Sequence, residues 1–155
     1  MCEMPDSLTD AYRAALYQVE LPDQRVELRV DVHSGSLQQW LERHSHHCAA
    51  LLTAHNPNSQ PCSATLNDQA QRNLQATIRS RGLTFQIGRN LDPLGHWPRE
   101  DSLLVPDLTL EEARALAVQF GQRAFLWCDA SGTPRLHHSA MRNSSSSSPS
   151  IPTRT

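Results

Sequence analysis

Polar side chains that could bind or activate a small molecule gather in residues 53–59, directly after the apolar run 48–52. Asn56 offers an amide and Ser59 a hydroxyl, and both groups can donate and accept hydrogen bonds. Pro57 disfavours right-handed helical angles at Asn56, so the chain turns where the apolar run ends. A buried strand that opens into a polar loop commonly carries ligand groups in α/β proteins. The alternative is that these side chains satisfy loop backbone groups and cap the next helix.

A second polar segment, residues 95–102, could supply a general base. Glu100 follows Arg99, and a carboxylate held by a cation can accept a proton from a substrate. The alternative is a solvated turn with a surface ion pair worth about 1 kcal/mol or less. Trp97 stands in a loop rich in proline and glycine, where it either folds back on the core or faces a ligand. Ser102 adds a hydroxyl at the start of the next apolar run.

Gln122 is a third candidate, because it stands between a predicted helix end at Gly121 and the apolar run 124–128. Its amide could point into the same crevice, or it could lie in solvent beside the helix C-cap. Glu100 is the one candidate for a catalytic role, and whether the protein is an enzyme stays open. The predicted binding residues are Asn56, Ser59, Ser102, Gln122 and Trp97.

The residue inventory excludes several chemistries. All fourteen basic residues are arginine, so no lysine can form a Schiff base or serve a phosphate-binding loop. There is no Gly-x-Ser-x-Gly nucleophile elbow. His44, His46, His47 and Cys48 lack the spacing of known zinc modules, which favours an exposed or satisfied histidine cluster. We therefore predict no metal site and no cofactor.

Charge and cysteine usage limit the partners and the compartment. The net charge is −2 with both signs interspersed, which argues against nucleic acid and against a membrane surface as partners. The four cysteines have no CxxC spacing, and two lie in apolar runs, so they are predicted to be reduced. No apolar stretch is long enough to span a bilayer, and the N-terminus does not resemble a signal peptide. A cytoplasmic protein is the simplest expectation.

Hydrophobic periodicity and capping patterns predict four helices, beginning near residues 7, 36, 65 and 109. Strands are predicted from alternating or continuous apolar runs at 17–21, 26–30, 48–52, 83–88, 102–105 and 124–128, with a short edge strand near 135–137. The first two strands form a hairpin. The strand, helix and strand between 48 and 88 predict a right-handed crossover and a parallel pair.

These elements indicate one α/β domain, with α+β as the alternative, in which a mixed sheet of about five to seven strands carries three to four helices. The domain is expected to span residues 7–140. Residues 1–6 are expected to be a flexible N-terminus. Residues 141–155, rich in serine and proline, cannot bury enough apolar area to offset ordering entropy and are predicted to be disordered.

Several spaced motifs run through the chain: Ala11-Tyr12, Tyr17, Thr53-Ala54-x-Asn56-Pro57-x-Ser59, Asn67, Trp97-Pro98-x-Glu100-x-Ser102-Leu103-Leu104-Val105, and Phe120-Gly121-Gln122-x-Ala124 with Trp127. Together they resemble an uncharacterised bacterial family, the domain of unknown function 3293, over about residues 8–137. The resemblance implies no activity, but it places the candidate residues on positions that look like family motifs. His55 departs from the aromatic residue, often Trp, expected there, and Asp101 stands where the family tends to have Pro.

Taken together, the sequence predicts a module that binds a small molecule, with an enzymatic role left open. Asn56 and Gln122 would orient the ligand through their amides, and Glu100 would be the base. The alternative is a non-catalytic protein-interaction or regulatory domain in which the same residues lock loops together. The sequence specifies neither the ligand, nor a protein partner, nor the oligomeric state.

Overall fold

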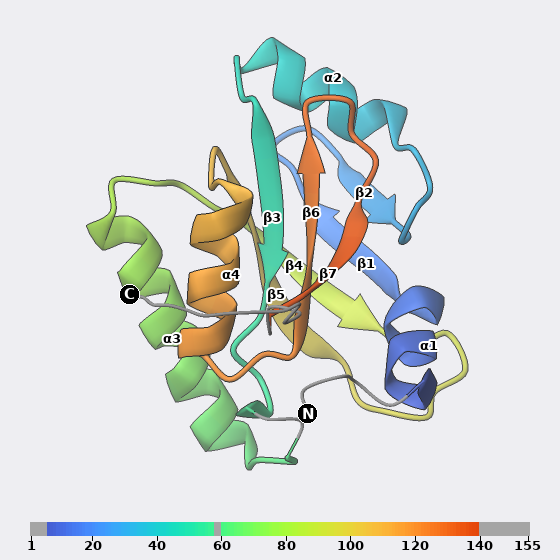
Figure 1. The fold of residues 1–155 in the computed structure, drawn as a ribbon, viewed down its shortest axis with the longest axis vertical. Coiled ribbons are helices and arrows are strands. Elements are labelled where there is room, and N and C mark those ends of the chain that lie inside the picture. Colours follow the sequence, from blue (N-terminus) through green and yellow to red (C-terminus); the bar gives the residue numbers. More distant parts are fainter. Residues whose placement is uncertain (1–5, 58–59, 140–155) are drawn as a thin grey trace, which may run out of the picture.

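The computed structural model describes residues 6–57 and 60–139, and within them the chain forms seven strands and four helices (Figure 1). The predicted tail 141–155, residues 1–5 of the predicted N-terminal segment, and Ser59 lie outside the described residues. No described helix has both the length and the apolar character that crossing a membrane requires. The helices are α1 (Asp6–Ala14), α2 (Gly35–Arg43), α3 (Ala64–Ser80) and α4 (Leu110–Gln119). The strands are β1 (Leu16–Glu20), β2 (Arg25–Leu28), β3 (Cys48–Leu52), β4 (Gln86–Leu91), β5 (Glu100–Pro106), β6 (Ala124–Asp129) and β7 (Arg135–His138).

The strands form a single sheet in the order β2-β1-β4-β5-β3-β6-β7. This confirms one sheet with helices packed on it, the hairpin β1–β2 and the edge strand β7. The expected parallel pair is wrong, because every pairing among the described strands is antiparallel. β3 and β4, joined through α3, run in the same direction, but β5 lies between them and hydrogen-bonds to both. The crossover therefore spans one strand instead of joining neighbours.

Strand β4 continues through Gly88, although the sequence suggests that the strand ends there. Gly88 pairs with Val19 of β1 on one side and with Ser102 of β5 on the other. A Cβ atom at Gly88 would lie 2.7 Å from the backbone oxygen of Gln18 and 2.9 Å from Ser102 Oγ. The glycine thus permits a close approach of neighbouring strands inside the sheet, which is a known use of glycine in strands.

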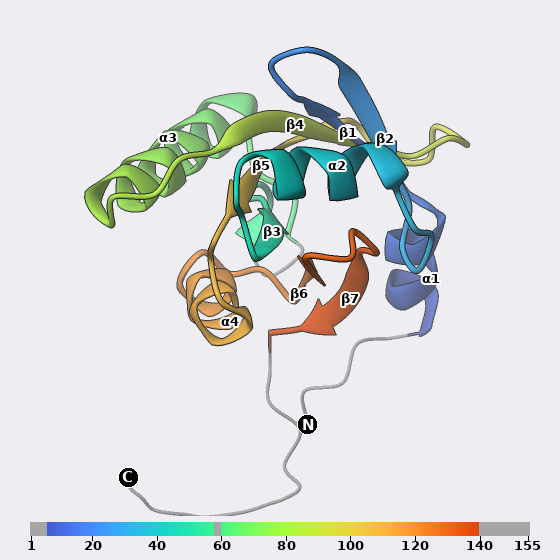
Figure 2. The ribbon, with the colours of Figure 1, turned by 90° about the horizontal axis from the view of Figure 1, so that it is seen from above.

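Apolar side chains cover both faces of the sheet, as the continuous burial of β3 requires. On one face, Ala50, Leu52, Leu103 and Val105 pack against α3 and α4. On the other face, side chains of β1, β2, β3 and β6 pack against Leu37, Trp40 and Leu41 of α2. Figure 2 shows that the sheet curls around α2, while α3 and α4 lie outside the curl.

Local capping signals account for the helix boundaries. Thr109 and Glu112 form the predicted capping box of α4. The caps of α2 and α3 are Ser34 and Ser63, each two residues before the predicted start. Gly82 follows α3 at φ 75°, the left-handed position at which helices commonly end and which glycine tolerates best.

Candidate functional site

A cavity of about 240 Å³ opens at one end of the sheet, where α1 lies beside β1, β4 and the start of β5. Three further segments close it: the loop after β3, the loop between β4 and β5, and the turn between α4 and β6. Four of the predicted site residues line this cavity, although they come from distant parts of the chain. The lining is Ala11, Tyr12, Ala15, Tyr17, His55, Asn56, Asn90, Trp97, Glu100, Gly121, Gln122 and Arg123.

Sheet register places three polar side chains side by side at the cavity. Tyr17 of β1 pairs with Asn90 of β4, and Asn90 pairs with Glu100 of β5. Directly paired residues in a sheet present their side chains to the same face, so the three groups form a row across three strands. The Tyr17 hydroxyl donates a 2.8 Å hydrogen bond to the backbone oxygen of Tyr12, which fastens α1 over this row.

Burial gives Glu100 the properties of a carboxyl group in a poorly solvated site. Desolvation raises the pKa of Glu100, and the hydrogen bond from Asn56 opposes that rise. Burial also raises the pKa of Tyr12 to about 12, with a further contribution from the Glu100 charge and an opposing one from Arg123. A proton-bearing ligand group would therefore meet both a carboxyl group and a phenol at this end of the sheet.

Asn56 is committed to the protein rather than to a ligand. Its Oδ1 accepts hydrogen bonds from the Cys62 backbone at 3.0 Å and from Asn67 Nδ2 at 2.9 Å. Its Nδ2 donates to Glu100 Oε2 at 3.1 Å, and its backbone N–H donates to Asn67 Oδ1 at 2.8 Å. Asn56 has φ 48°, a left-handed conformation that asparagine tolerates better than most residues. The structure therefore favours a positioning role, in which Asn56 holds the loop and orients Glu100.

Gln122 lies in the crevice and not in solvent. It is buried, and its Nε2 donates to the backbone oxygens of His55 at 2.9 Å and of Phe120 at 3.2 Å. These bonds tie the turn before β6 to the loop after β3. Gln122 thus fastens two walls of the cavity to each other, which satisfies its amide N–H groups within the protein.

The remaining predicted residues are not all brought to the cavity. Trp97 lines it and also packs against the apolar cluster on the α2 side of the sheet. Ser102 is 1 % exposed, lies opposite Gly88 and is not among the lining residues. Ser59 is outside the described residues. The site therefore unites Asn56, Trp97, Glu100 and Gln122, while Ser102 belongs to the sheet interior.

Sequence reasoning missed four polar lining residues: Tyr12, Tyr17, Asn90 and Arg123. Tyr12 and Tyr17 appear in the family motifs, but nothing in their spacing assigns them to a site. Asn90 is missed because its strand was expected to end at Gly88. Its Oδ1 is buried and has no hydrogen-bond partner among the described residues. A buried acceptor without a partner needs an explanation, and in a cavity lining a ligand contact is one such explanation.

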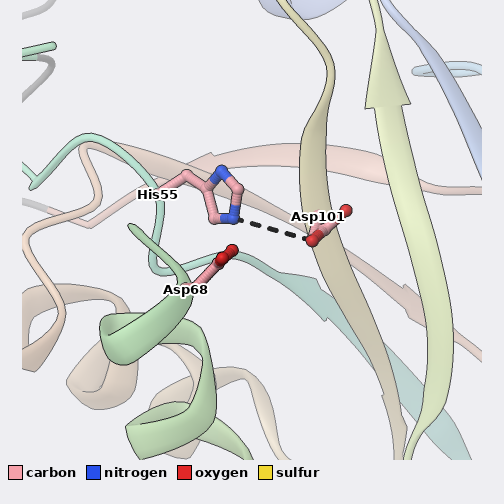
Figure 3. A group of neighbouring side chains, drawn as sticks. All are labelled: His55, Asp68 and Asp101. Atoms are coloured by element: carbon pink, nitrogen blue, oxygen red, sulfur yellow. Dashed lines mark ion pairs between the residues drawn. The ribbon is translucent and has the colours of Figure 1, made fainter. Parts of the chain in front are cut away.

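The histidine-rich segment before β3 is explained by packing. His44 and His46 lie against the Trp40 ring, with ring centroids 5.6 Å and 5.1 Å away. His46 Nδ1 lies 2.7 Å from Asp107 Oδ2, which joins this segment to the turn after β5. A different group, His55, Asp68 and Asp101, has the composition of a metal-binding set, and Figure 3 shows it beside the loop after β3.

The fold and the cavity define a single-domain α+β protein with a polar pocket at one end of its sheet. Residues 52–125 match the family model described as a protein of unknown function, DUF3293, which confirms the resemblance over that segment. The match includes Asn56, Asn90, Glu100 and Gln122 but not the residues of α1 and β1. The chain has no match among curated proteins and none among solved structures.

Proposed function

We propose that the protein binds a small molecule carrying an amino or amidino group in the cavity between α1 and the end of the sheet. The observation that carries the proposal is the pair of adjacent acceptors, Asn90 Oδ1 and the Glu100 carboxyl group. Asn90 Oδ1 is buried without a hydrogen-bond partner in the described part of the chain, and Glu100 is held in place by Asn56. A ligand N–H group that reached both would satisfy a buried acceptor and compensate a poorly solvated carboxylate.

The other walls fit such a ligand. Tyr12, Tyr17 and Trp97 supply aromatic surface, which contributes apolar contact area and can attract a cationic group. The cavity of about 240 Å³ is slightly smaller than the range typical of drug-sized ligands, so the ligand is the size of a small metabolite. The side-chain amides of Asn56 and Gln122 already donate hydrogen bonds within the protein, so these two residues position the walls of the cavity.

A catalytic role for Glu100 is the second candidate. Enzymes raise the pKa of carboxyl groups by burial so that these groups can exchange protons near neutral pH. The pKa of Glu100 is also raised by burial. Catalysis would require a ligand whose reacting proton lies within hydrogen-bonding distance of the carboxyl group. The interaction-domain alternative is supported only for Asn56 and Gln122, whose amides tie loops together.

We also place the protein in a bacterial cytoplasm as part of this proposal. The buried cysteines Cys48 and Cys128 and the partly buried Cys62 are free thiols, which fits a reducing compartment. The family resemblance supports the bacterial source.

Binding of a fragment panel tests the proposed function. Small amines and amidines, each beside a carboxylic acid of the same shape, would be screened by ligand-observed NMR and ranked by Kd. We expect the amines to bind, and Glu100→Gln to weaken binding by tenfold or more, because a charge-assisted hydrogen bond contributes about 1.5–3 kcal/mol. The matched control is Glu111→Gln, which changes an exposed glutamate on α4. Binding of acids alone, or equal affinity of amines for the Glu100→Gln variant, would refute the proposal.

A further inference from the structure

Three side chains with metal-ligating atoms meet beside the loop after β3 (Figure 3). His55 comes from that loop, Asp68 from the second turn of α3, and Asp101 from β5. One ligand atom from each residue lies within 4.8 Å of the other two. The group therefore joins a loop, a helix and a strand around one point.

The His55 ring supplies an independent sign that this point is a binding site. Its side chain is 10 % exposed, and Nε2 is buried without a hydrogen-bond partner among the described residues. Nε2 points toward the carboxylates, but its distance to Asp101 Oδ2 is 3.9 Å, too long for a hydrogen bond (Figure 3). A buried ring nitrogen that faces two carboxylates without bonding to either is suited to an ion placed between them.

The backbone around the three residues is fixed by hydrogen bonds. Thr53 Oγ1 donates to the backbone oxygen of Asp101 at 2.6 Å and accepts from the backbone N–H of His55 at 3.1 Å. The neighbours of His55 are held by α3, the helix that carries Asp68: Ala54 N–H donates to Gln71 Oε1 at 3.0 Å, and Asn56 N–H to Asn67 Oδ1. Hydrogen bonds of this kind hold side chains in place before a ligand binds.

The charges also favour a cation. His55 Nε2 is available as a ligand, because it has no hydrogen-bond partner among the described residues. The two aspartates leave a negative charge beside it. Arg99 supplies a counter-charge, since its Nε lies 3.9 Å from Asp101 Oδ1 on an exposed side chain. Exposed pairs of this kind are weak and would not prevent a divalent ion from binding.

We propose that His55, Asp68 and Asp101 bind one divalent transition-metal ion of the Zn²⁺ or Mn²⁺ type. An imidazole nitrogen with two carboxylates suits these ions, whereas Ca²⁺ and Mg²⁺ prefer oxygen ligands alone. Two ligands bound at about 2.0–2.2 Å lie at most about 4.4 Å apart. The three ligand atoms already lie within 4.8 Å of one another, so binding would need only small side-chain movements. Three protein ligands leave coordination positions for water, and the ion would clamp the loop after β3 to α3 and β5.

The metal site adjoins the cavity proposed to bind a small molecule, because His55 also lines that cavity, whereas Asp68 and Asp101 do not. His55 precedes Asn56, which donates a hydrogen bond to Glu100.

Titration of the metal-free full chain with Mn²⁺ in ¹⁵N-edited NMR tests the proposal directly. A paramagnetic ion broadens the amide signals around it, so we expect the strongest broadening at residues 54–56, 68 and 101. Equilibrium dialysis would give the stoichiometry, with one Zn²⁺ per chain that Mg²⁺ does not displace. Broadening centred on residues 44–48 or 137–138 instead would overturn the proposal, as would no binding at all.

Single substitutions show whether the metal binds at this site or at other histidine and acidic residues. Asp68→Asn and His55→Gln should each weaken Mn²⁺ and Zn²⁺ binding at least tenfold, while His47→Gln and Asp10→Asn, both at exposed positions, should leave it unchanged. Asp68 is exposed, so its variant tests the proposal even if His55→Gln does not fold. Equal metal affinity of Asp68→Asn and the unaltered chain would refute the assignment.

Discussion

Asn56 donates a 3.1 Å hydrogen bond from Nδ2 to Glu100 Oε2, across 44 positions of sequence. The same amide accepts two hydrogen bonds through Oδ1, so one side chain joins the loop after β3, the start of α3 and the start of β5. This bond also moderates the effect of burial on the Glu100 pKa. The walls of the cavity and the orientation of its carboxyl group thus depend on one residue.

Replacing Asn56 with alanine should lower the free energy of unfolding by about 2 kcal/mol or more. The variant leaves Asn67 and the Cys62 N–H without their partner, and an unsatisfied buried group costs about 1–3 kcal/mol. Alanine at φ 48° adds backbone strain of about 1–2 kcal/mol. Urea unfolding monitored by circular dichroism would measure the loss.

Asn56→Gly is the matched control, because glycine adopts the positive φ without strain but also lacks the side chain. We expect the glycine variant to lie between the unaltered chain and Asn56→Ala in stability. If both variants unfold at the same urea concentration as the unaltered chain, the positioning role of Asn56 is wrong.

The elements of this fold could be predicted from local signals. The capping box at Thr109, the glycine after α3 at position 82 and the continuous apolar run of β3 each act within a few residues, and the structure contains all three. The loop after β3 was identified in the same way, because a polar, Pro-containing segment follows a buried strand. These features need no knowledge of distant contacts.

The arrangement of the sheet and half of the site could not be predicted, because both depend on pairing between distant strands. The insertion of β5 between β3 and β4 has no local signature, so a strand-helix-strand pattern suggested a parallel pair. Tyr17 and Asn90 reach the cavity only through the β1–β4 register. A glycine at position 88 suggests a strand end when the sequence is considered alone. Its role in the structure depends on the atoms of the neighbouring strands that lie close to it.

The cysteines should differ in reactivity. Burial raises the pKa of Cys128 from 9.0 to about 12 and also raises the pKa of Cys48, whereas Cys62 is only partly buried. Since the thiolate is the nucleophile, iodoacetamide at about pH 8 should alkylate Cys62 and spare Cys48 and Cys128. Peptide mapping by mass spectrometry would locate the label, and early labelling of Cys128 would contradict the burial described.

The raised pKa of Cys128 also predicts a loss of stability in alkali. The folded-state pKa of Cys128 exceeds the unfolded value, so the unfolded chain loses this proton first as pH rises. The free energy of unfolding should therefore fall between about pH 9 and about pH 12, and no contribution from Cys128 is expected below that window. Unfolding by urea at several pH values, compared with Cys128→Ala, would isolate the effect.

Gly88→Ala should destabilise the sheet by about 1–3 kcal/mol, the usual cost of forcing a methyl group into a packed interior. The new Cβ would lie 2.7 Å from the Gln18 backbone oxygen, which cannot move without displacing β1. Gly35→Ala is the control, since nothing lies within 4 Å of a Cβ there and alanine favours the α2 helix. Equal melting temperatures for the two variants would refute the close-approach role of Gly88.

Ser102→Ala should be neutral or slightly stabilising, although Ser102 is almost completely buried in a central strand. Its Oγ has no hydrogen-bond partner among the described residues, so the substitution removes a desolvated hydroxyl and breaks no bond. It also removes one of the two atoms that would lie within 3.0 Å of a Cβ at Gly88. The double variant Gly88→Ala, Ser102→Ala should therefore be more stable than the sum of the single changes implies, while the Gln18 contact keeps it below the unaltered chain. A double-mutant cycle from urea unfolding measures this coupling, and a strongly destabilised Ser102→Ala would show that the hydroxyl has a structural partner.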